Sequence, residues 1–317
     1  MDSISRLLVV ALLLCLFCTG CRTVAFPETN ADAVDRWLAE CGEWDDWDKP
    51  APPFLIHENT YYVGTCGISV ILVTTKAGHF LIDSGTRQGA EHVVRNIESL
   101  GFRVEDVNVL LHSHEHFDHV GGIHYLQTLS GAKLLASGAA ASVLASGLAA
   151  TRDPQFGLHD PFEGATVSGL VVPGRPVTLG QMSLMPVATP GHTPGALSWQ
   201  WQSCDSRGCL DIVYADSLSP IGRDDYRFSA DSAYVDAFRK GLRRLAALDC
   251  DFLLTPHPSA SRMVRRLRSG TLWDPTACQN YAESIRTRLN KRLQDERSNP
   301  QAKRPIAAAA RPGFSVD

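Results

Sequence analysis

The sequence of 317 residues has one long apolar run, at residues 7–17, and that run is shorter than the roughly 20 residues of a membrane-spanning helix. Charge of one sign is not in excess, since the formal net charge is -4, and no basic stripe alternates with aromatic residues. These absences argue against nucleic acid, a polyanion or a membrane surface as a partner. With 44% hydrophobic and 20% charged residues, the chain has the composition of a globular protein that buries a large core.

The N-terminus has the pattern of an export signal. Arg6 precedes the apolar run, and small residues such as Gly20 follow it. This order predicts a signal peptide at residues 1–20, cleaved near residues 20–25, with a retained anchor as the alternative. Residues 18–21 also resemble a lipobox, although Cys18 stands where that motif prefers leucine. A lipid anchor at Cys21 and a free exported protein therefore both stay open.

Cysteine usage agrees with export to an oxidising compartment. Of nine cysteines, the six that follow the signal region are an even set, which suits disulfides: Cys41, Cys66, Cys204, Cys209, Cys250 and Cys278. None stands in a metal-type C-x-x-C motif, and free buried thiols are the alternative. The spacing alone does not choose among the pairings, but Cys204 and Cys209 flank a tight turn and are expected to close one loop.

The chain alternates between strand-like and helix-like segments. Residues 22–50 are expected to be irregular, with Trp37, Trp44 and Trp47 packed on the body, and residues 151–166 to form a long loop. Alternating and apolar patterns predict strands at residues 68–75, 79–83, 107–111, 133–136, 177–179, 182–188, 196–202, 210–215 and 251–255, and helices at residues 89–100, 139–148, 233–248 and 275–295. This order predicts an α/β fold of two similar halves in one domain, residues 22–297, followed by a flexible tail at residues 298–317.

The densest chemical signal lies at residues 112–122, directly after a predicted buried strand. His114 and His116 alternate along the chain, so their side chains share one side and can hold one ion. Asp118 and His119 follow a turn and can reach a second ion. Zn²⁺ accepts imidazole nitrogen and carboxylate oxygen, whereas so many polar groups would be unfavourable to bury unpaired. We therefore predict a metal site here. His112 is expected to be a strand residue or to stand behind a ligand, and Glu115 to pair with nearby backbone or a cation and not to bind metal.

Two later histidines stand in rigid turns after predicted strands. His192 lies within the Pro-Gly-His-Thr-Pro-Gly turn at residues 190–195, and His257 lies between two prolines. A histidine fixed by such neighbours loses little conformational entropy when it binds a metal. Together with the cluster these histidines would complete two sites, each with three protein ligands and an open position, which is the catalytic pattern for zinc.

This constellation resembles the metallo-β-lactamase superfamily. The likeness covers residues 81–85, the H-x-H-x-D-H segment, the turn that carries His192, residues 214–216 and His257. It implies an αββα four-layer sandwich with the metals at one edge between the halves. By the same resemblance His114, His116 and His192 hold a first zinc, and Asp118, His119 and His257 hold a second.

Residues 61–65, 211–219 and 254–260 look like subclass B3 in particular. Ser217 stands where other subclasses place a cysteine ligand. The likeness to members with three disulfides implies the pairs Cys41–Cys66, Cys204–Cys209 and Cys250–Cys278. It also implies a periplasmic monomer that uses two Zn²⁺ ions to hydrolyse the amide bond of penicillins, cephalosporins and carbapenems, and so confers antibiotic resistance.

The resemblance suggests roles for further side chains. A metal-bound hydroxide would be the nucleophile, and Asp118 would orient it. Ser217 and Ser219, two apart on an extended segment, would bind the substrate carboxylate unless they only cap local backbone, and Gln155 would face the substrate from the long loop.

Two aspartates are expected to support the ligands. Asp83 would orient a ligand from behind, unless it is only a strand-end turn residue. Asp216 would support a ligand in a β-lactamase but would bridge the metals in a relative of glyoxalase II type. A thioesterase of that type, a lactonase and a non-catalytic zinc-binding envelope protein are the alternative functions.

Overall fold

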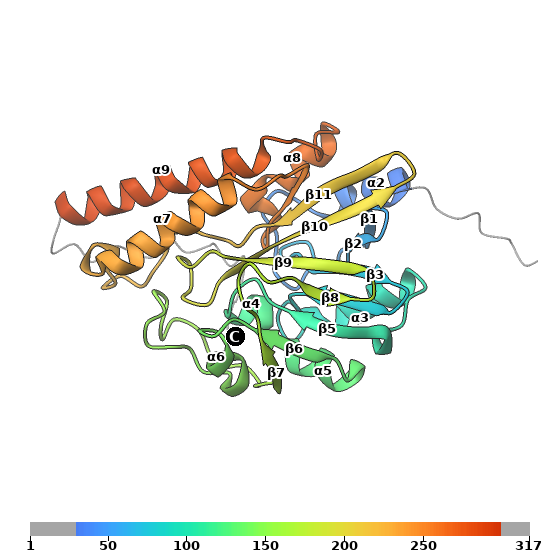
Figure 1. Cartoon of the computed structure of the whole chain (residues 1–317), viewed down its shortest axis with the longest axis horizontal. Helices are drawn as coiled ribbons and strands as arrows, with labels where there is room; N and C mark the ends of the chain where they lie inside the picture. The colour runs from blue at the N-terminus through green and yellow to red at the C-terminus, as the bar shows by residue number, and fades with distance from the viewer. Residues whose placement is uncertain (1–29, 299–317) are drawn as a thin grey trace, which may run out of the picture.

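The computed structural model describes residues 30–298 (Figure 1). The predicted signal peptide, the possible anchor at Cys21 and the predicted tail beyond residue 298 lie outside the described residues. Within residues 30–298, none of the helices combines the length and apolar character that crossing a membrane requires.

The first sheet has seven strands in chain order, with antiparallel pairing up to β4 and parallel pairing from β4 to β7. Its strands are β1 (Phe54–His57), β2 (Thr60–Tyr62), β3 (Ile71–Thr75), β4 (Gly78–Ile82), β5 (Val107–Leu111), β6 (Lys133–Ala136) and β7 (Val167–Leu170). The central strand β5 is apolar at four of its five positions because both of its faces are covered, as parallel strands require.

The second sheet has five strands in the order β12-β11-β10-β9-β8. Its strands are β8 (Val177–Leu179), β9 (Met182–Ala188), β10 (Leu197–Asp205), β11 (Gly208–Tyr214) and β12 (Phe252–Leu254). Strands β8 to β11 are antiparallel neighbours, whereas β12 runs parallel to β11 after a helical crossover. The β10–β11 pair is the long hairpin in yellow and gold at the upper right of Figure 1.

Helices cover the outer face of each sheet (Figure 1). The helices before β8 are α2 (Asn30–Glu40), α3 (Gly89–Ser99), α4 (Phe117–Val120), α5 (Ile123–Ser130) and α6 (Ala141–Ser146), with the 3-10 turn η1 (Val104–Asp106). Those after β11 are α7 (Ser232–Ala246), α8 (Met263–Arg268) and α9 (Ala277–Ser298), with η2 (Phe228–Ala230) and η3 (Pro258–Ser261).

Three apolar clusters separate four layers and confirm the predicted αββα sandwich. One cluster lies between the sheets and joins residues such as Phe80 of β4 to Trp199 of β10. A second joins the first sheet to α3 and α5, and a third joins the second sheet to α7 and α9. Burial of apolar surface on both faces of both sheets is the main force that holds the halves together.

The expectation of an irregular segment at residues 22–50 was wrong for residues 30–40, which form α2. Val34, Trp37 and Leu38 recur at helical spacing, and Trp37 is completely buried against the first sheet. Trp47 does pack on the body, but Trp44 is 79% exposed and does not. The short strands β1, β2 and β7 were also missed, because three or four residues carry too little periodicity to be recognised.

The three disulfides implied by the resemblance are present: Cys41–Cys66, Cys204–Cys209 and Cys250–Cys278. Cys204 and Cys209 stand opposite each other at the end of the β10–β11 hairpin, as the tight turn between them predicts. The other two disulfides join residues 25 and 28 positions apart. Cys41–Cys66 ties the segment after α2 to the loop before β3, and Cys250–Cys278 ties the start of α9 to the segment before β12.

Candidate metal centre

The predicted metal-binding side chains follow the carboxyl ends of three strands, one in the first sheet and two in the second. The segment with His114, His116, Asp118 and His119 follows β5 and continues into α4. His192 lies in the loop from β9 to β10, and His257 follows β12 directly before η3. The fold therefore brings four residues of one loop to two single histidines from the other half.

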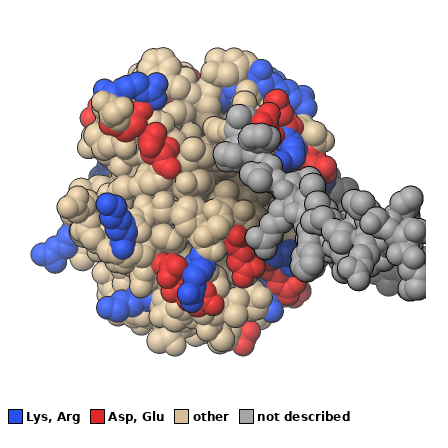
Figure 2. Space-filling view, turned by 90° about the vertical axis from the view of Figure 1, so that its right-hand side faces the viewer, with Lys and Arg blue, Asp and Glu red and all other residues tan. Residues whose placement is uncertain are grey.

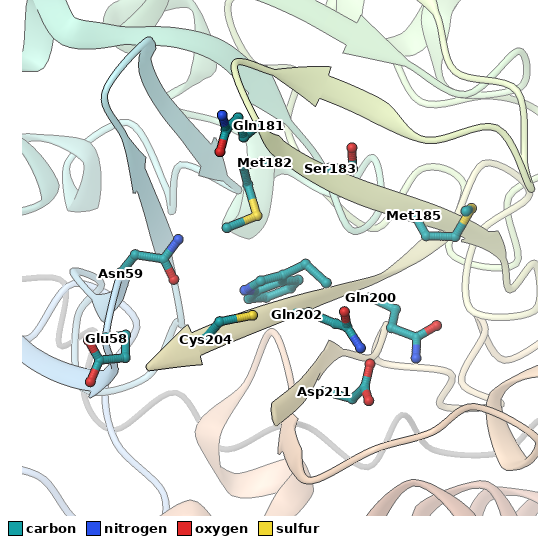
Figure 3. Close-up of a pocket in the computed structure, with 11 residues that line it drawn as sticks. Glu58, Asn59, Gln181, Met182, Ser183, Met185, Gln200, Gln202, Cys204 and Asp211 are labelled. Atoms are coloured by element: carbon teal, nitrogen blue, oxygen red, sulfur yellow. The ribbon is translucent and has the colours of Figure 1, made fainter. Parts of the chain in front are cut away.

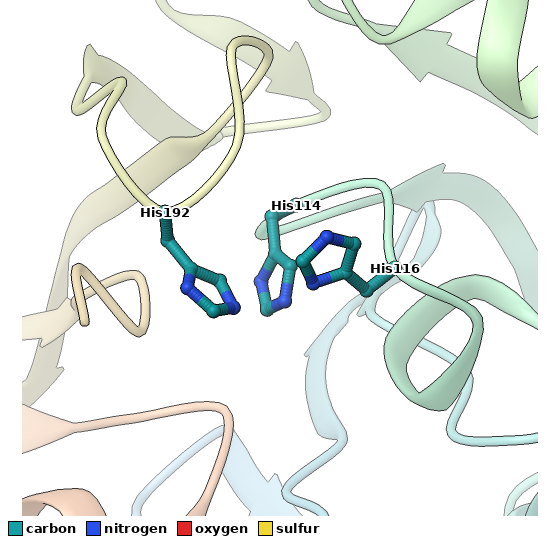
Figure 4. Close-up of side chains that lie close together, drawn as sticks. All are labelled: His114, His116 and His192. Carbon is teal, nitrogen blue, oxygen red and sulfur yellow. The ribbon is translucent and has the colours of Figure 1, made fainter. Parts of the chain in front are cut away.

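Three imidazoles form a compact first group (Figure 4). One ring nitrogen from each of His114, His116 and His192 lies within 4.8 Å of the other two, and all three residues are buried. The ring centroids lie 4.7 to 5.0 Å apart, with the rings nearly perpendicular to one another. Nε2 of His114 is buried and has no hydrogen-bond partner among the described residues. An unpaired buried nitrogen between two other imidazoles fits a zinc ion.

Each imidazole of the first group has an oxygen behind it. Nε2 of His116 lies 2.9 Å from Oδ2 of Asp153, and Nδ1 of His192 lies 3.0 Å from the carbonyl oxygen of Ser219. Nδ1 of His114 lies 3.1 Å from the hydroxyl oxygen of Ser113, its hydrogen-bond partner, and 2.9 Å from Oδ1 of Asp216. Such partners fix which ring nitrogen carries the proton and leave the other nitrogen free for a metal.

Asp118, His119 and His257 form a second group beside the first. Oδ2 of Asp118 lies 3.1 Å from Nε2 of His119 and 3.4 Å from Nε2 of His257, and the two nitrogens are 3.2 Å apart. His114 also lies near the carboxylate of Asp118 and the ring of His119, so the two groups adjoin. One carboxylate with two imidazoles is a donor set that suits zinc.

Burial and neighbouring charge tune these groups for metal binding. Burial lowers the pKa of His114 and His192 well below the usual range, so both are neutral at pH 7, the form in which imidazole binds a metal. Burial opposes ionisation of Asp118, but the imidazoles of His119 and His257 outweigh it and hold the pKa of Asp118 well below its usual range. Burial likewise opposes protonation of His119, yet Asp118 raises the pKa of His119 to about 10. A metal at this group would replace that proton.

Asp83 is completely buried and supports the segment that carries the ligands. Its Oδ1 accepts a 2.6 Å hydrogen bond from the backbone N–H of Ser113, and Oδ2 accepts from the hydroxyls of Ser113 and Tyr214, each at 2.7 Å. Oδ2 lies 3.6 Å from Nδ1 of His119, beyond hydrogen-bond distance. Asp83 also has a left-handed φ of 65°, so the turn depends on these bonds.

Asp216 is also completely buried and points at the rear of His114. Its Oδ2 accepts a 3.0 Å hydrogen bond from the N–H of Leu218, which closes a local turn. Oδ1 is buried and has no hydrogen-bond partner among the described residues, although it lies 2.9 Å from Nδ1 of His114, and Asp216 belongs to neither donor group. This placement suits a supporting residue better than a carboxylate that bridges two metals.

The three predicted substrate residues lie in different surroundings. Ser217 is buried, and its hydroxyl has no hydrogen-bond partner among the described residues. The hydroxyl of Ser219 lies 3.0 Å from Nδ1 of His192. Leu218, between Ser217 and Ser219, has a left-handed φ of 48°. The segment is therefore not regularly extended, and the two serine hydroxyls differ in direction. Oε1 of Gln155 lies 3.2 Å from Nε2 of His159, in the long loop. Their contact with substrate stays a prediction.

Sequence patterns gave no indication of Asp153, which is 3% exposed and bonded to His116. Its Oδ1 also accepts a 2.7 Å hydrogen bond from the N–H of Gln155, so one carboxylate joins a metal ligand to the long loop. The Asp-Pro pair that begins this turn was visible in the sequence, but nothing local links it to His116, which is 37 positions away.

Aromatic side chains at the second group were missed as well. The ring of Trp47 lies 5.6 Å from that of Phe117 and 6.0 Å from that of His257. Phe117 is also 5.1 Å from His159, whose ring is 5.5 Å from that of His116. These partly buried rings give the metal groups an apolar border.

His112 and Glu115 lie beside the ligands but away from both groups. Nε2 of His112 accepts a 3.0 Å hydrogen bond from the N–H of Ser137, and burial lowers the pKa of His112 to about 4. Glu115 is 3% exposed, and burial raises its pKa to about 7 despite hydrogen bonds from Thr193 and Gly195. Neither residue belongs to a donor group, and Glu115 pairs with nearby backbone, as predicted.

A separate cavity of about 650 Å³ lies beside the second sheet (Figure 3). At the end of the molecule that Figure 2 faces, charged side chains surround a central area that has none. The cavity contains none of the predicted metal or substrate residues and is lined by Glu58, Asn59, Gln181, Met182, Ser183, Met185, Gln200, Trp201, Gln202, Cys204 and Asp211. Glu58 of this lining forms a third group of potential metal donors with His57 and Asp205, but these three residues are partly or fully exposed. The groups that contain His114 are buried and hold more imidazoles, so the chemistry of the donors places the site at the histidines.

Comparison with known proteins agrees with this geometry. The family model described as the metallo-β-lactamase superfamily matches residues 63–205. The solved structure of MIM-2 metallo-β-lactamase is 55% identical, covers 83% of this chain and 98% of its own, and superposes with a TM-score of 0.81. This chain belongs to the metallo-β-lactamase superfamily. It is accordingly a hydrolase of that family.

Further relatives extend the same likeness. MEM-A1, a subclass B3 metallo-β-lactamase from a soil metagenome library, is 40% identical over 80% of this chain and 100% of its own, with a TM-score of 0.76. A probable metallo-hydrolase of Burkholderia pseudomallei is 30% identical over 225 residues, 67% of each chain. In this metallo-β-lactamase, His257 lies beyond residues 63–205, the segment that the family model matches. Its assignment to the site therefore rests on its contacts with Asp118 and His119.

Proposed function

We propose that this protein is a subclass B3 β-lactamase that binds two zinc ions and hydrolyses the amide bond of β-lactam antibiotics in the periplasm. The observation that carries the proposal is the pair of adjoining donor groups, one of three buried imidazoles and one of a carboxylate with two imidazoles. The likeness to the metallo-β-lactamases MIM-2 and MEM-A1 supports the substrate class.

The two groups would hold the metals in different ways. His114, His116 and His192 would hold the first zinc, and Asp118, His119 and His257 the second. When bound, the zinc ions supply a water made acidic enough to act as nucleophile near pH 7 and a positive charge that polarises the lactam carbonyl. No serine or cysteine nucleophile is then required.

The residues of this chain would position the reactants. Asp118 stays ionised because His119 and His257 hold its pKa low, so it can accept a hydrogen bond from the attacking water. Asp153 and the Ser219 carbonyl fix the imidazoles of His116 and His192, so their geometry needs no reorganisation during the reaction. Ser219, Ser217 and Gln155 are the proposed contacts for the substrate.

The main alternative is a hydrolase of glyoxalase II type or a lactonase on the same scaffold. A bridging aspartate would favour that alternative, but the carboxylate of Asp216 lies behind His114 and bonds to Leu218. The disulfides also favour an exported enzyme, because disulfides persist in oxidising compartments.

The decisive experiment measures hydrolysis of a chromogenic cephalosporin and of a carbapenem by the purified protein. We expect turnover with zinc, loss of turnover with a chelator, and recovery when zinc is restored. A glutathione thioester and a lactone assayed in parallel test the alternatives. Absence of β-lactam turnover by micromolar, zinc-loaded enzyme would refute the proposal, and thioester turnover in its place would support the alternative.

A further inference from the structure

A short line of hydrogen bonds joins the two halves of the sandwich beside the first metal group. The N–H of Leu197 donates to the carbonyl of Ser113 at 2.7 Å, and Nε1 of Trp199 donates to the carbonyl of His112 at 2.9 Å. The hydroxyl of Ser137 donates to the carbonyl of Gly195 at 2.7 Å. Each of these bonds joins the first sheet or its loops to strand β10 or to the loop before it.

Glu115 contributes the two bonds of this line that lie nearest to His192. Its Oε2 accepts a 2.6 Å hydrogen bond from the hydroxyl of Thr193, and its Oε1 accepts a 2.8 Å bond from the N–H of Gly195. Glu115 is 3% exposed and Thr193 is fully buried. No lysine or arginine of the described residues forms an ion pair with Glu115. The carboxylate therefore depends on these two donors to offset its burial.

The position of Glu115 in the chain gives these bonds a specific consequence. Glu115 lies between His114 and His116, and Thr193 directly follows His192. One side chain thus connects the two ligands from the first half to the one ligand from the second half. The imidazole of His192 is held from its other side by the carbonyl of Ser219.

We propose that Glu115 is a positioning residue that fixes the His192 turn against His114 and His116 and so pre-forms the first zinc site. The inference rests on zinc binding at this site as proposed above. Without the carboxylate, the turn would keep the bond between Ser137 and Gly195 and the strand bonds beyond it, but the residue next to His192 would lose its contact with the first half.

The backbone of the turn at Gly195 lies close against the carboxylate of Glu115. A Cβ atom at Gly195 would lie 2.7 Å from the backbone nitrogen of Ala140 and 2.8 Å from Oε1 of Glu115. The absence of a side chain at Gly195 is therefore what lets the carboxylate reach its N–H. Glutamine could replace both bonds, because its oxygen can accept from Gly195 and its amide can donate to the hydroxyl of Thr193. Alanine could replace neither.

The test compares zinc retention in wild type, Glu115→Ala and Glu115→Gln. Zinc-loaded protein is titrated with a competing chelator, and bound zinc per chain is measured by mass spectrometry. Substitution with Co²⁺ shows by its absorption bands which donor group is filled. We expect Glu115→Ala to weaken the first site by about 10- to 100-fold and to leave the second site unchanged, and Glu115→Gln to stay within about threefold of wild type.

Matched controls separate positioning from general damage. Ser137→Ala removes a bond to the same turn on the side away from His192 and should bind zinc like wild type. If Glu115→Ala does not fold, Thr193→Val tests the same contact by removing one bond, and Thr193→Ser should restore it. Equal loss at both zinc sites, or wild-type retention in Glu115→Ala or Thr193→Val, would overturn the proposal.

The charge of Glu115 is tested separately. A Glu115→Gln variant as weak as Glu115→Ala would assign the effect to the negative charge and would also overturn a positioning role. Because zinc retention is measured without a β-lactam, failure of this inference is distinct from failure of the proposed hydrolysis. An inactive protein that still binds zinc in the expected order of variants would refute only the proposed substrate.

Discussion

The two donor groups each combine two residues of the loop after β5 with one histidine of the other half, but they differ in burial and in how they are held. The first group combines ligands from both halves of the sandwich, and all three of its imidazoles are buried. The second takes Asp118 and His119 from one loop and adds His257, whose side chain is 25% exposed. Both groups therefore depend on the contact between the halves, but the second is completed by a histidine at a more open position.

The supporting contacts follow the same division. Carboxylates stand behind two ligands of the first group, Asp153 behind His116 and Asp216 behind His114. In the second group Nδ1 of His257 lies 3.2 Å from the carbonyl oxygen of Gly67, next to the disulfide at Cys66. The groups should consequently respond to different substitutions, even though they adjoin.

Removal of a ligand should have the largest effect. His192→Ala should lose the first zinc and lower kcat/KM by more than about 1,000-fold, because a zinc ion contributes several kcal/mol of charge stabilisation in the transition state. His257→Ala should release the second zinc and keep the first, since the buried imidazoles remain together. Zinc content and β-lactam kinetics measure both effects. A His192→Ala variant with two bound zincs and full activity would contradict the ligand assignment.

Loss of the Cys41–Cys66 disulfide should distinguish the groups by stability. The double variant Cys41→Ala/Cys66→Ala opens a loop of 25 residues and should lower the free energy of unfolding by about 3 kcal/mol. Because Gly67 follows Cys66, zinc retention should fall more at the second group than at the first. Urea unfolding and chelator titration measure these changes, with Cys204→Ala/Cys209→Ala as the control far from Gly67. An equal fall in zinc retention at both groups in Cys41→Ala/Cys66→Ala would show that the disulfide does not support the second group in particular.

The carboxylate behind His116 gives the next effect. Asp153→Ala should reduce zinc affinity at the first group or activity by about 10- to 100-fold, since the proton of Nε2 loses its acceptor. Asp153→Asn keeps an oxygen that can accept this proton, so it should lose less. The ratio of the two variants, measured by chelator titration, reports how much of the effect is orientation. Retention of wild-type affinity in Asp153→Ala would show that His116 needs no such partner.

How much of the site was visible in the sequence depended on separation along the chain. His114, His116, Asp118 and His119 fall within six positions, and this density has few structural explanations. His192 was recognisable because glycines and prolines fix its turn. Asp153 was not, because its contact with His116 depends on how the long loop folds back, which no local pattern encodes.

The fold shows the same limit. Strong apolar runs such as the one in β5 were located correctly, and the order of segments together with the family resemblance predicted the four layers. The three-residue strand β2 was missed, because its pairing with β1 and β3 is set by tertiary contacts that outweigh local propensity. The helix α2 was missed for a different reason: its polar residues obscured the apolar spacing of Val34, Trp37 and Leu38.

Trp47, beside the second group, should give the smallest effect. Trp47 contacts the rings of Phe117 and His257, so Trp47→Ala should cost about 1 kcal/mol in stability and loosen the second zinc more than the first. Trp44, which is 79% exposed, is the matched control, and Trp44→Ala should change stability by less than about 0.5 kcal/mol. Thermal unfolding of zinc-loaded protein and chelator titration give both values. If Trp47→Ala weakened both groups equally, the border of aromatic rings would support both of them and not the second in particular.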